Sequence, residues 1–159
     1  MTGIVVAVAQ QKGGAGKTTV AAHLATAWLR LGRSVALVDV DPQGSLAAWG
    51  AARAAQGGRW PALTVEAASG WRADTIAARL AGTHDLVLLD TPPHGEIDSR
   101  SAIRAARLVV VPVQPTPLDV WATRPTLALA EAEGRPVLVV LNRVPARATL
   151  TEAMRAILQ

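Results

Sequence analysis

Residues 11–19 read Gln-Lys-Gly-Gly-Ala-Gly-Lys-Thr-Thr, and they follow a short apolar run from Ile4 to Ala9. The run is rich in valine, which is typical of a buried β-strand. The next stretch, Thr18 to Leu31, has apolar residues at helical spacing. A glycine-rich loop between a strand and a helix is a setting in which backbone N–H groups bind phosphate.

Strands and helices are expected to alternate along the rest of the chain. Short apolar runs bounded by turn residues predict further strands at Ser34–Val40, Leu63–Glu66, Leu86–Leu89, Leu108–Val113 and Val137–Leu141. This alternation predicts an α/β fold with a doubly wound, mainly parallel sheet flanked by helices. The polar loops 10–17, 41–45 and 91–98 all follow strands, so we expect them to gather at the carboxyl edge of the sheet, where ligands bind.

The composition fits one globular domain over residues 1–159, because half of the residues are hydrophobic and no low-complexity linker interrupts them. Cysteine is absent, which excludes disulfides, thiolate metal sites and a cysteine nucleophile. No apolar run is long enough to span a membrane, and the N-terminus does not resemble a signal peptide. A cytoplasmic protein is therefore expected.

The positive charge is unevenly distributed. Residues 1–99 carry eight Lys or Arg against eight Asp or Glu, whereas residues 100–159 carry eight against four. The C-terminal surplus consists of arginine, whose planar guanidinium suits phosphate contacts. These arginines fit either a nucleic-acid surface or ordinary solvated faces.

The glycine-rich loop departs from the usual P-loop spacing in an informative way. Gln11 stands where the first glycine is expected, and an additional lysine, Lys12, follows it. The pattern Lys-Gly-Gly-x-Gly-Lys-Thr-Thr resembles the deviant Walker A motif of the ParA/MinD group of ATPases, and the preceding Gln is common in the ParA branch. The resemblance covers residues 3–158 and implies the P-loop NTPase fold, with ATP and Mg²⁺ as ligands.

In this loop the second lysine, Lys17, is expected to reach the β- and γ-phosphates, and the Thr18 hydroxyl is expected to bind Mg²⁺. The resemblance implies that Lys12 crosses a nucleotide-sandwich dimer to the phosphates of the partner, so that homodimerisation requires ATP. Both lysines would therefore serve catalysis. The nucleotide is expected to contact Gly13, Gly14, Ala15, Gly16, Lys17, Thr18 and Thr19.

Three carboxylates are expected beside the phosphates. Residues 38–44 read Val-Asp-Val-Asp-Pro-Gln-Gly, and by resemblance Asp41 orients, or accepts a proton from, the attacking water while Asp39 supports the Mg²⁺ shell. An Asp before Pro also commonly forms a turn. The apolar run that closes on Asp90 is the Walker B pattern, so Asp90 would hold Mg²⁺ through water. The following Thr-Pro-Pro loop is a candidate switch that His94 could approach.

Two later segments resemble parts of the family's nucleotide site. Asn142 follows the last predicted strand, at the position where family members contact adenine. The Pro-rich segment 112–117 resembles one that lies near the nucleotide and the dimer interface. It could equally form a rigid turn before a helix that starts near Asp119 and is capped by it.

The resemblance to ParA also implies non-specific DNA binding by the ATP dimer, association with the nucleoid, and a ParB-like or other stimulatory partner. The cargo could be a plasmid, a chromosome or a protein cluster. Candidate DNA contacts, by charge and position alone, are Arg124, Arg143, Arg147 and Arg155.

Other branches that share the phosphate loop can be tested by composition. The nitrogenase iron-protein type needs cysteines and the bacterial tyrosine-kinase type needs a tyrosine-rich tail, and this sequence has neither residue. The MinD type ends in a basic amphipathic membrane helix, whereas residues 151–159 contain Arg155 as their one cation. MinD-like membrane association is therefore the weaker alternative, and no membrane partner is expected.

A non-hydrolysing, nucleotide-gated interaction module is a further alternative. ParA relatives generally continue with another strand and terminal helices that this domain apparently lacks, which would leave a sheet edge or an apolar patch exposed to a partner. Arg107 also precedes the fifth predicted strand, where relatives often carry Asp. The sequence offers no role for Arg107.

Overall fold

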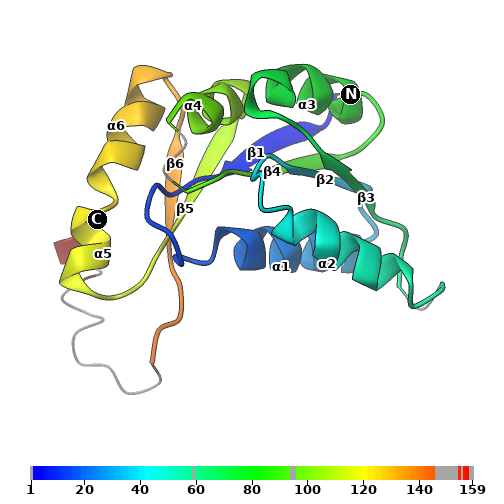
Figure 1. Cartoon of the computed structure of the whole chain (residues 1–159), viewed down its shortest axis with the longest axis horizontal. Coiled ribbons are helices and arrows are strands. Elements are labelled where there is room, and N and C mark those ends of the chain that lie inside the picture. Colours follow the sequence, from blue (N-terminus) through cyan, green and yellow to red (C-terminus); the bar gives the residue numbers. More distant parts are fainter. Residues whose placement is uncertain (1, 59, 94–95, 146–153, 155, 158–159) are drawn as a thin grey trace.

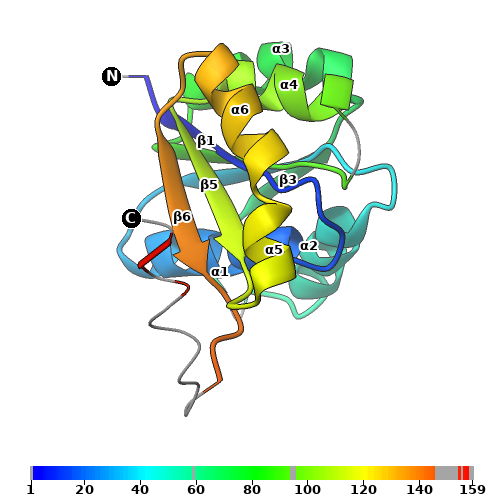
Figure 2. The same cartoon turned by 90° about the vertical axis from the view of Figure 1, so that its left-hand side faces the viewer.

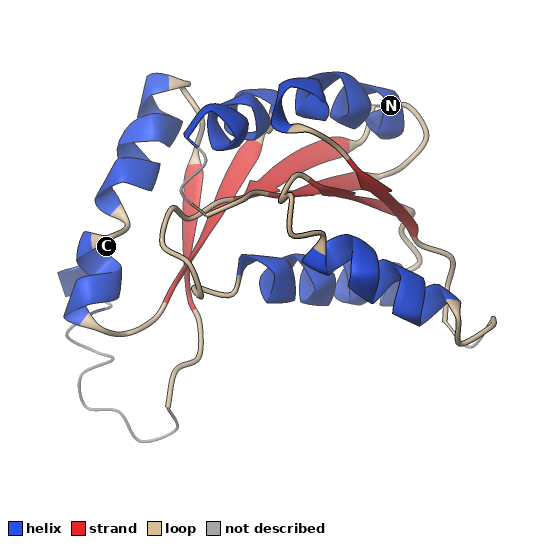
Figure 3. Cartoon of the chain, viewed as in Figure 1, coloured by secondary structure: helices blue, strands red, loops and turns tan. Residues whose placement is uncertain are grey.

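The computed structural model describes residues 2–58, 60–93, 96–145, 154 and 156–157. In this part of the chain six strands form one sheet, with helices on both faces (Figure 1, Figure 3). The strands are β1 (Ile4–Val8), β2 (Val35–Asp39), β3 (Thr64–Ala67), β4 (Leu86–Asp90), β5 (Leu108–Val113) and β6 (Val137–Leu141). The helices are α1 (Lys17–Arg30), α2 (Ser45–Ala54), η1 (Gly70–Arg72), α3 (Ala73–Ala81), α4 (Glu96–Ala105), α5 (Pro117–Trp121) and α6 (Arg124–Ala132).

The sheet is parallel and has the order β3-β2-β4-β1-β5-β6. From the central β1 the chain builds β2 and β3 on one side, returns to place β4 between β2 and β1, and then builds β5 and β6 on the other side, which is the doubly wound arrangement that the sequence predicts. The register places Val8 and Asp39 on either side of Asp90, so three strands end at the same level. Side chains attached at these strand ends therefore meet at one edge of the sheet.

Two separate cores hold the helices against the sheet. On one face, buried residues of β1, β2 and β4 such as Val8, Leu37 and Leu88 pack against α1 and α2. On the other face, α3, α4 and α6 cover residues such as Val38 and Leu89. Figure 2 shows α5 and α6 beside β5 and β6. Burial on both faces explains why the strands are continuously apolar rather than alternating.

The predicted strands and first helix are confirmed, each with ends within one residue of those observed. The predicted cap of the helix near Asp119 is wrong. Thr116 is the N-cap of α5: its hydroxyl oxygen accepts the Asp119 N–H at 3.1 Å, and Pro117 occupies the first helical position. A threonine followed by proline satisfies this helix start. Asp119 lies in the first turn, where one carboxylate oxygen accepts the Thr116 hydroxyl and the other faces Lys12.

Gly50 in α2 generates a prediction about stability. A β-carbon there would lie 2.7 Å from Cγ2 of Val65 on β3, closer than van der Waals contact. Alanine in place of glycine normally stabilises a helix by about 1 kcal/mol. Overpacking typically costs about 1–3 kcal/mol, and stiff Val65 cannot rotate away easily, so Gly50→Ala should lower the free energy of unfolding in urea titrations.

The double variant Gly50→Ala/Val65→Ala is the control. Removing the two valine methyl groups relieves the contact, so the two substitutions should be strongly non-additive. Additive losses would show that the clash between α2 and β3 does not limit stability.

Candidate functional site

The carboxyl ends of the strands collect the polar loops at one edge of the sheet, as predicted (Figure 1). The glycine-rich loop joins β1 to α1, the Asp41 turn joins β2 to α2, and Asp90 ends β4. Gln114 follows β5 and Asn142 follows β6. Segments far apart in the sequence therefore surround the glycine-rich loop.

The loop needs its glycines for two physical reasons. Gly14 and Gly16 have φ values of 78° and 94°, in the left-handed region that side chains disfavour. A β-carbon on Gly16 would also lie 2.3 Å from Nδ2 of Asn142. No side chain of the described residues caps α1 at Gly16, so the first N–H groups of that helix remain available to an anionic ligand.

Lys17 begins α1 and is buried, with its ammonium donating a hydrogen bond to the backbone oxygen of Gln10 at 2.9 Å. Burial lowers the pKa of Lys17, and the negative charges of Asp90 and Asp41 partly oppose that effect. The cation is thus held close to the loop at an energetic cost. A nearby phosphate would reduce this cost by supplying negative charge.

Thr18 and Asp90 meet across the edge. The Thr18 hydroxyl donates to Oδ2 of Asp90 at 2.6 Å, while the buried Oδ1 of Asp90 has no hydrogen-bond partner among the described residues. Burial raises the pKa of Asp90 to about 6, the Thr18 hydrogen bond opposes this, and Asp39 and Asp41 add to it. An unpaired buried oxygen beside a hydroxyl is a fitting place for a divalent cation, since Mg²⁺ prefers oxygen ligands.

Asp39 and Asp41 shape the neighbouring turn. The buried carboxylate of Asp39 accepts the N–H of Asp41 at 3.1 Å and the N–H of Ala47, in the first turn of α2, at 2.8 Å. Oδ1 of Asp41 accepts the N–H of Gln43 at 3.0 Å. Asp39 thus fixes the turn and the start of α2. Its support of a Mg²⁺ shell and the proton-accepting role of Asp41 remain predictions.

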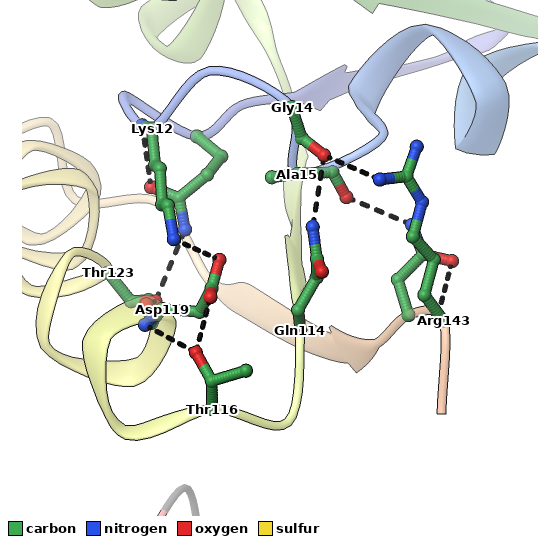
Figure 4. Close-up of polar contacts among 10 residues, drawn as sticks. Lys12, Gly14, Ala15, Gln114, Thr116, Asp119, Thr123 and Arg143 are labelled. Atoms are coloured by element: carbon green, nitrogen blue, oxygen red, sulfur yellow. Dashed lines mark hydrogen bonds and ion pairs between the residues drawn. The ribbon is translucent and has the colours of Figure 1, made fainter. Parts of the chain in front are cut away.

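Lys12 forms an ion pair within its own chain (Figure 4). Its ammonium lies 2.8 Å from Oδ1 of Asp119, whose side chain is 7% exposed compared with 38% for Lys12. The Thr116 hydroxyl donates to the other oxygen of the same carboxylate. Lys12 is therefore tied to α5 here, and its predicted reach to a partner subunit would require this pair to open.

A buried polar network connects the loop to the start of α6. The Gln10 side chain donates to Oγ1 of Thr123 and accepts from the hydroxyl of Thr126, both at 3.2 Å. Oγ1 of Thr126 in turn accepts the N–H of Gln11 at 3.2 Å. Sequence analysis missed these residues, although a polar Gln10 directly after an apolar strand was a usable signal.

Three further side chains hold the loop from its other side, and Figure 4 shows Gln114 and Arg143 pointing at it. Gln114 and Arg143 each donate to the backbone oxygen of Gly14 at 3.1 Å, and Asn142 donates to that of Ala15 at 2.9 Å. Gln114 was not singled out from the sequence. The predicted roles of Asn142 at adenine and of Arg143 at DNA stay predictions.

The remaining candidates lie apart from the site or outside the described residues. Arg124 is exposed at the start of α6, and Arg107 is exposed before β5. His94, Arg147 and Arg155 lie outside the described residues. Among the residues that are described, no group of three or more His, Asp or Glu could hold a metal ion by itself.

The raised pKa of Asp90 predicts how stability depends on pH in the metal-free protein. A carboxyl group that titrates at about 6 instead of 3.8 costs about 3 kcal/mol at neutral pH. The stability that the protonated group provides is present below pH 4 and is lost as pH rises through about 6. Asp90→Asn should therefore raise the free energy of unfolding at pH 7.5, with EDTA present, far more than at pH 4.5.

Asp85→Asn provides a control of opposite sign. Hydrogen bonds from the backbone N–H and hydroxyl of Ser34 lower the pKa of Asp85, so its charged form stabilises the fold at neutral pH. This variant should be destabilised at pH 7.5. Equal effects of the two substitutions in urea titrations would contradict the electrostatic account of Asp90.

Comparison with known proteins agrees with this geometry. The family model of the CobQ/CobB/MinD/ParA nucleotide binding domain matches residues 6–159. Maintenance of carboxysome distribution protein A of Halothiobacillus neapolitanus is 32% identical over 161 residues, which cover 96% of this chain and 72% of that protein. The chromosome-partitioning ATPase Soj of Thermus thermophilus is 40% identical over 135 residues, covering 69% of this chain and 54% of Soj.

A solved structure shows the same fold. Cobyrinic acid a,c-diamide synthase from Mycobacterium smegmatis, with bound ADP and magnesium, matches with a TM-score of 0.82 at 24% identity, over 98% of this chain and 80% of that chain. The resemblance inferred from the phosphate loop is thus confirmed at the level of the family. This chain belongs to the CobQ/CobB/MinD/ParA family of nucleotide-binding domains.

Proposed function

We propose that this chain is a ParA-type ATPase that binds Mg-ATP, hydrolyses it slowly, dimerises with ATP bound, and binds DNA non-specifically to position a cargo. The observation that carries the proposal is the edge where Lys17 and Thr18 face Asp90, whose Oδ1 lacks a partner among the described residues. A buried ammonium, a hydroxyl and an unpaired carboxylate oxygen complement a triphosphate with its divalent ion.

ATP would occupy the loop through the N–H groups of residues 13–19, with Lys17 at the β- and γ-phosphates. Thr18 and Asp90 would hold Mg²⁺, and Asp39 would support its water shell from behind. When bound, Mg²⁺ supplies positive charge that offsets the charge on the phosphate oxygens. The ADP and magnesium bound to the similar synthase domain support this assignment.

Asp41 is the candidate for handling the attacking water. A hollow of about 420 Å³ lies beside it, and Asp39, Ser69 and Asp98 also line this space. The hollow leaves room for water next to the carboxylate, which would orient the water and accept its proton. Lys12 and Lys17 would stabilise the negative charge that develops on the transferred phosphoryl group.

Lys12 makes dimerisation dependent on nucleotide. Two Lys12 side chains facing each other across an interface repel unless bound triphosphates supply negative charge between them. In the single chain Asp119 neutralises Lys12 at 2.8 Å, so partner phosphates must compete with a buried carboxylate. The ion pair would therefore bias the chain toward the monomer until ATP is bound.

Lys12→Ala should bind ATP with nearly unchanged affinity yet stay monomeric, because its role lies across the interface. Asp119→Asn, which removes the competing charge while keeping the side-chain shape, should dimerise with ATP at lower protein concentration than the unmodified chain. Sedimentation velocity with ATP, ADP and no nucleotide measures both effects. ATP-dependent dimers formed normally by Lys12→Ala would disprove this role of the lysine.

Cargo positioning is supported by the relatives, one named for chromosome partitioning and one for carboxysome distribution. The MinD-like alternative predicts an amphipathic helix that lies on the membrane surface, and vesicle binding tests it. Within the described residues, no helix is both long and apolar enough to cross a bilayer. The non-hydrolysing interaction module remains an alternative, since it needs the same nucleotide site.

Asp41→Ala separates these alternatives, because loss of the proton acceptor should trap the ATP-bound state. We expect this variant to form ATP-dependent dimers that bind random-sequence duplex DNA, with affinity that falls steeply as salt rises, and no binding with ADP. Fluorescence anisotropy of labelled duplex at several salt concentrations measures this, with anionic vesicles tested in parallel. ATP-bound dimers that do not bind DNA would contradict the ParA-type proposal. Binding of these dimers to anionic vesicles would favour the MinD-like alternative.

A further inference from the structure

Helices α1 and α2 cover the same face of the sheet (Figure 1). A small pocket lies between their C-terminal halves. It has a volume of about 270 Å³ and is lined by Thr26, Arg30, Trp49, Ala52, Arg53, Gln56 and Trp60. Arg30 is the last residue of α1, whose first residue is Lys17 in the phosphate loop. At about 1.5 Å per residue, the helix separates the pocket from the phosphate site by roughly 20 Å.

The pocket walls are fixed by specific contacts. The guanidinium carbon of Arg53 lies 5.9 Å from the ring centre of Trp49 and 5.7 Å from that of Trp60, within cation–π range. Arg53 also donates to the backbone oxygen of Pro61 at 2.8 Å, and the Trp60 indole N–H donates to Gln56 at 3.1 Å. The two indoles are therefore held in place before any ligand arrives.

A second hollow of about 310 Å³ shares Arg53 and Trp60 as walls. The rest of its lining is small or apolar: Gly50, Ala54, Gly58, Pro61, Ala62 and Leu63. Two hollows, the first with a mixed lining and the second with a mainly apolar one, thus flank one exposed indole.

The surroundings of the pocket contain no carboxylate from the elements that build it. Residues 17–38 and 42–65 include no Asp or Glu, and they contribute Arg30 and Arg53 to the lining of the pocket. Arg30 lines the pocket, is exposed and forms no ion pair with a described residue, whereas Arg33 lies outside the lining and helps to lower the pKa of Asp85. The rim of the pocket is therefore positively charged and suited to acidic groups.

The small volumes of the two hollows favour a peptide as the ligand over a metabolite or a nucleic acid. Pockets for small molecules usually measure about 300–1,000 Å³ and enclose most of the ligand, whereas each hollow here is smaller or near the lower limit. Two hollows separated by an indole match two apolar side chains on one backbone. A DNA duplex has no group that could enter them, and Trp and Arg are the residues most enriched at the energetic centres of protein interfaces.

We propose that the α1–α2 pocket docks a segment of a partner protein in which large apolar side chains alternate with Asp or Glu. The apolar side chains enter the two hollows on either side of Trp60, and the carboxylates pair with Arg30. This docking site is distinct from the nucleotide edge and does not depend on ATP binding or hydrolysis.

The test begins with selection from a random linear peptide library displayed on phage, using the full chain without nucleotide. Enriched peptides should combine large apolar residues with Asp and Glu. A synthetic, fluorescein-labelled copy of the most enriched peptide then gives a Kd by anisotropy. A charge-reversed copy with Lys in place of each acidic residue should bind at least about tenfold more weakly, which corresponds to about 1.4 kcal/mol.

Two variants and a matched control locate the binding site. Arg30→Glu and Trp60→Ala each change an exposed side chain, and each should weaken the peptide at least about tenfold, as expected for a residue at an interface centre. Arg107→Glu makes the same charge change at an exposed position outside the pocket and should leave the Kd unchanged. Circular dichroism confirms that all three are folded.

NMR adds a measurement that distinguishes binding at the pocket from non-specific binding of the peptide. In a ¹H–¹⁵N spectrum the indole signals of Trp49 and Trp60 should move on adding peptide, while those of Trp71 and Trp121 should not. Failure of the library to enrich acidic–apolar peptides, or equal binding to Arg30→Glu, Trp60→Ala and the unmodified chain, would overturn the proposal. Displacement of the peptide by oligo(dT), with the same indole shifts, would reassign the pocket to single-stranded nucleic acid.

Discussion

Two ionisable side chains are held out of water where β1 and β4 end, and much of this molecule is organised around that constraint. Lys17 is buried against the Gln10 backbone, and Asp90 is buried against Thr18 with one oxygen unpaired. Opposite charges nearby reduce the cost of burying each group without removing it, as the pKa shifts of both residues indicate. The burial of these two groups is thus unfavourable, and a bound phosphate and divalent ion would relieve it.

The parallel sheet makes this arrangement possible. Because Val8, Asp39 and Asp90 end their strands at one level, a carboxylate on one strand reaches the loop that follows another. Side chains from α5, α6 and the ends of β5 and β6 then surround the glycine-rich loop. Gln10 couples it to Thr123 and Thr126, while Asn142 holds Ala15. The loop is supported mainly by side chains distant in sequence, which is why glycine can dominate it without leaving it unsupported.

The sequence predicted the strands, the parallel sheet and the phosphate loop well, because buried parallel strands and a glycine-rich turn leave strong local patterns. It predicted less about which distant residues contact the glycine-rich loop and hold it in place. The Lys12–Asp119 pair and the Gln10–Thr126 contact join residues more than a hundred positions apart, and no local pattern links them. The cap of α5 was assigned to Asp119 instead of Thr116, because either residue type can cap a helix and the choice depends on where the first turn begins.

The position of β1 has a consequence for how the chain acquires its native state. β1 is made first, yet it lies between β4 and β5, and its loop is completed by contacts with Thr126 and Asn142. A nascent chain emerging from the ribosome therefore carries an unassembled phosphate loop until Thr126 and Asn142 have been made. Contacts of such large sequence separation form slowly, because a long loop must close before they contribute. Nucleotide would consequently act only after α6 and the end of β6 have been made, so it would stabilise the assembled loop rather than guide the early steps of folding.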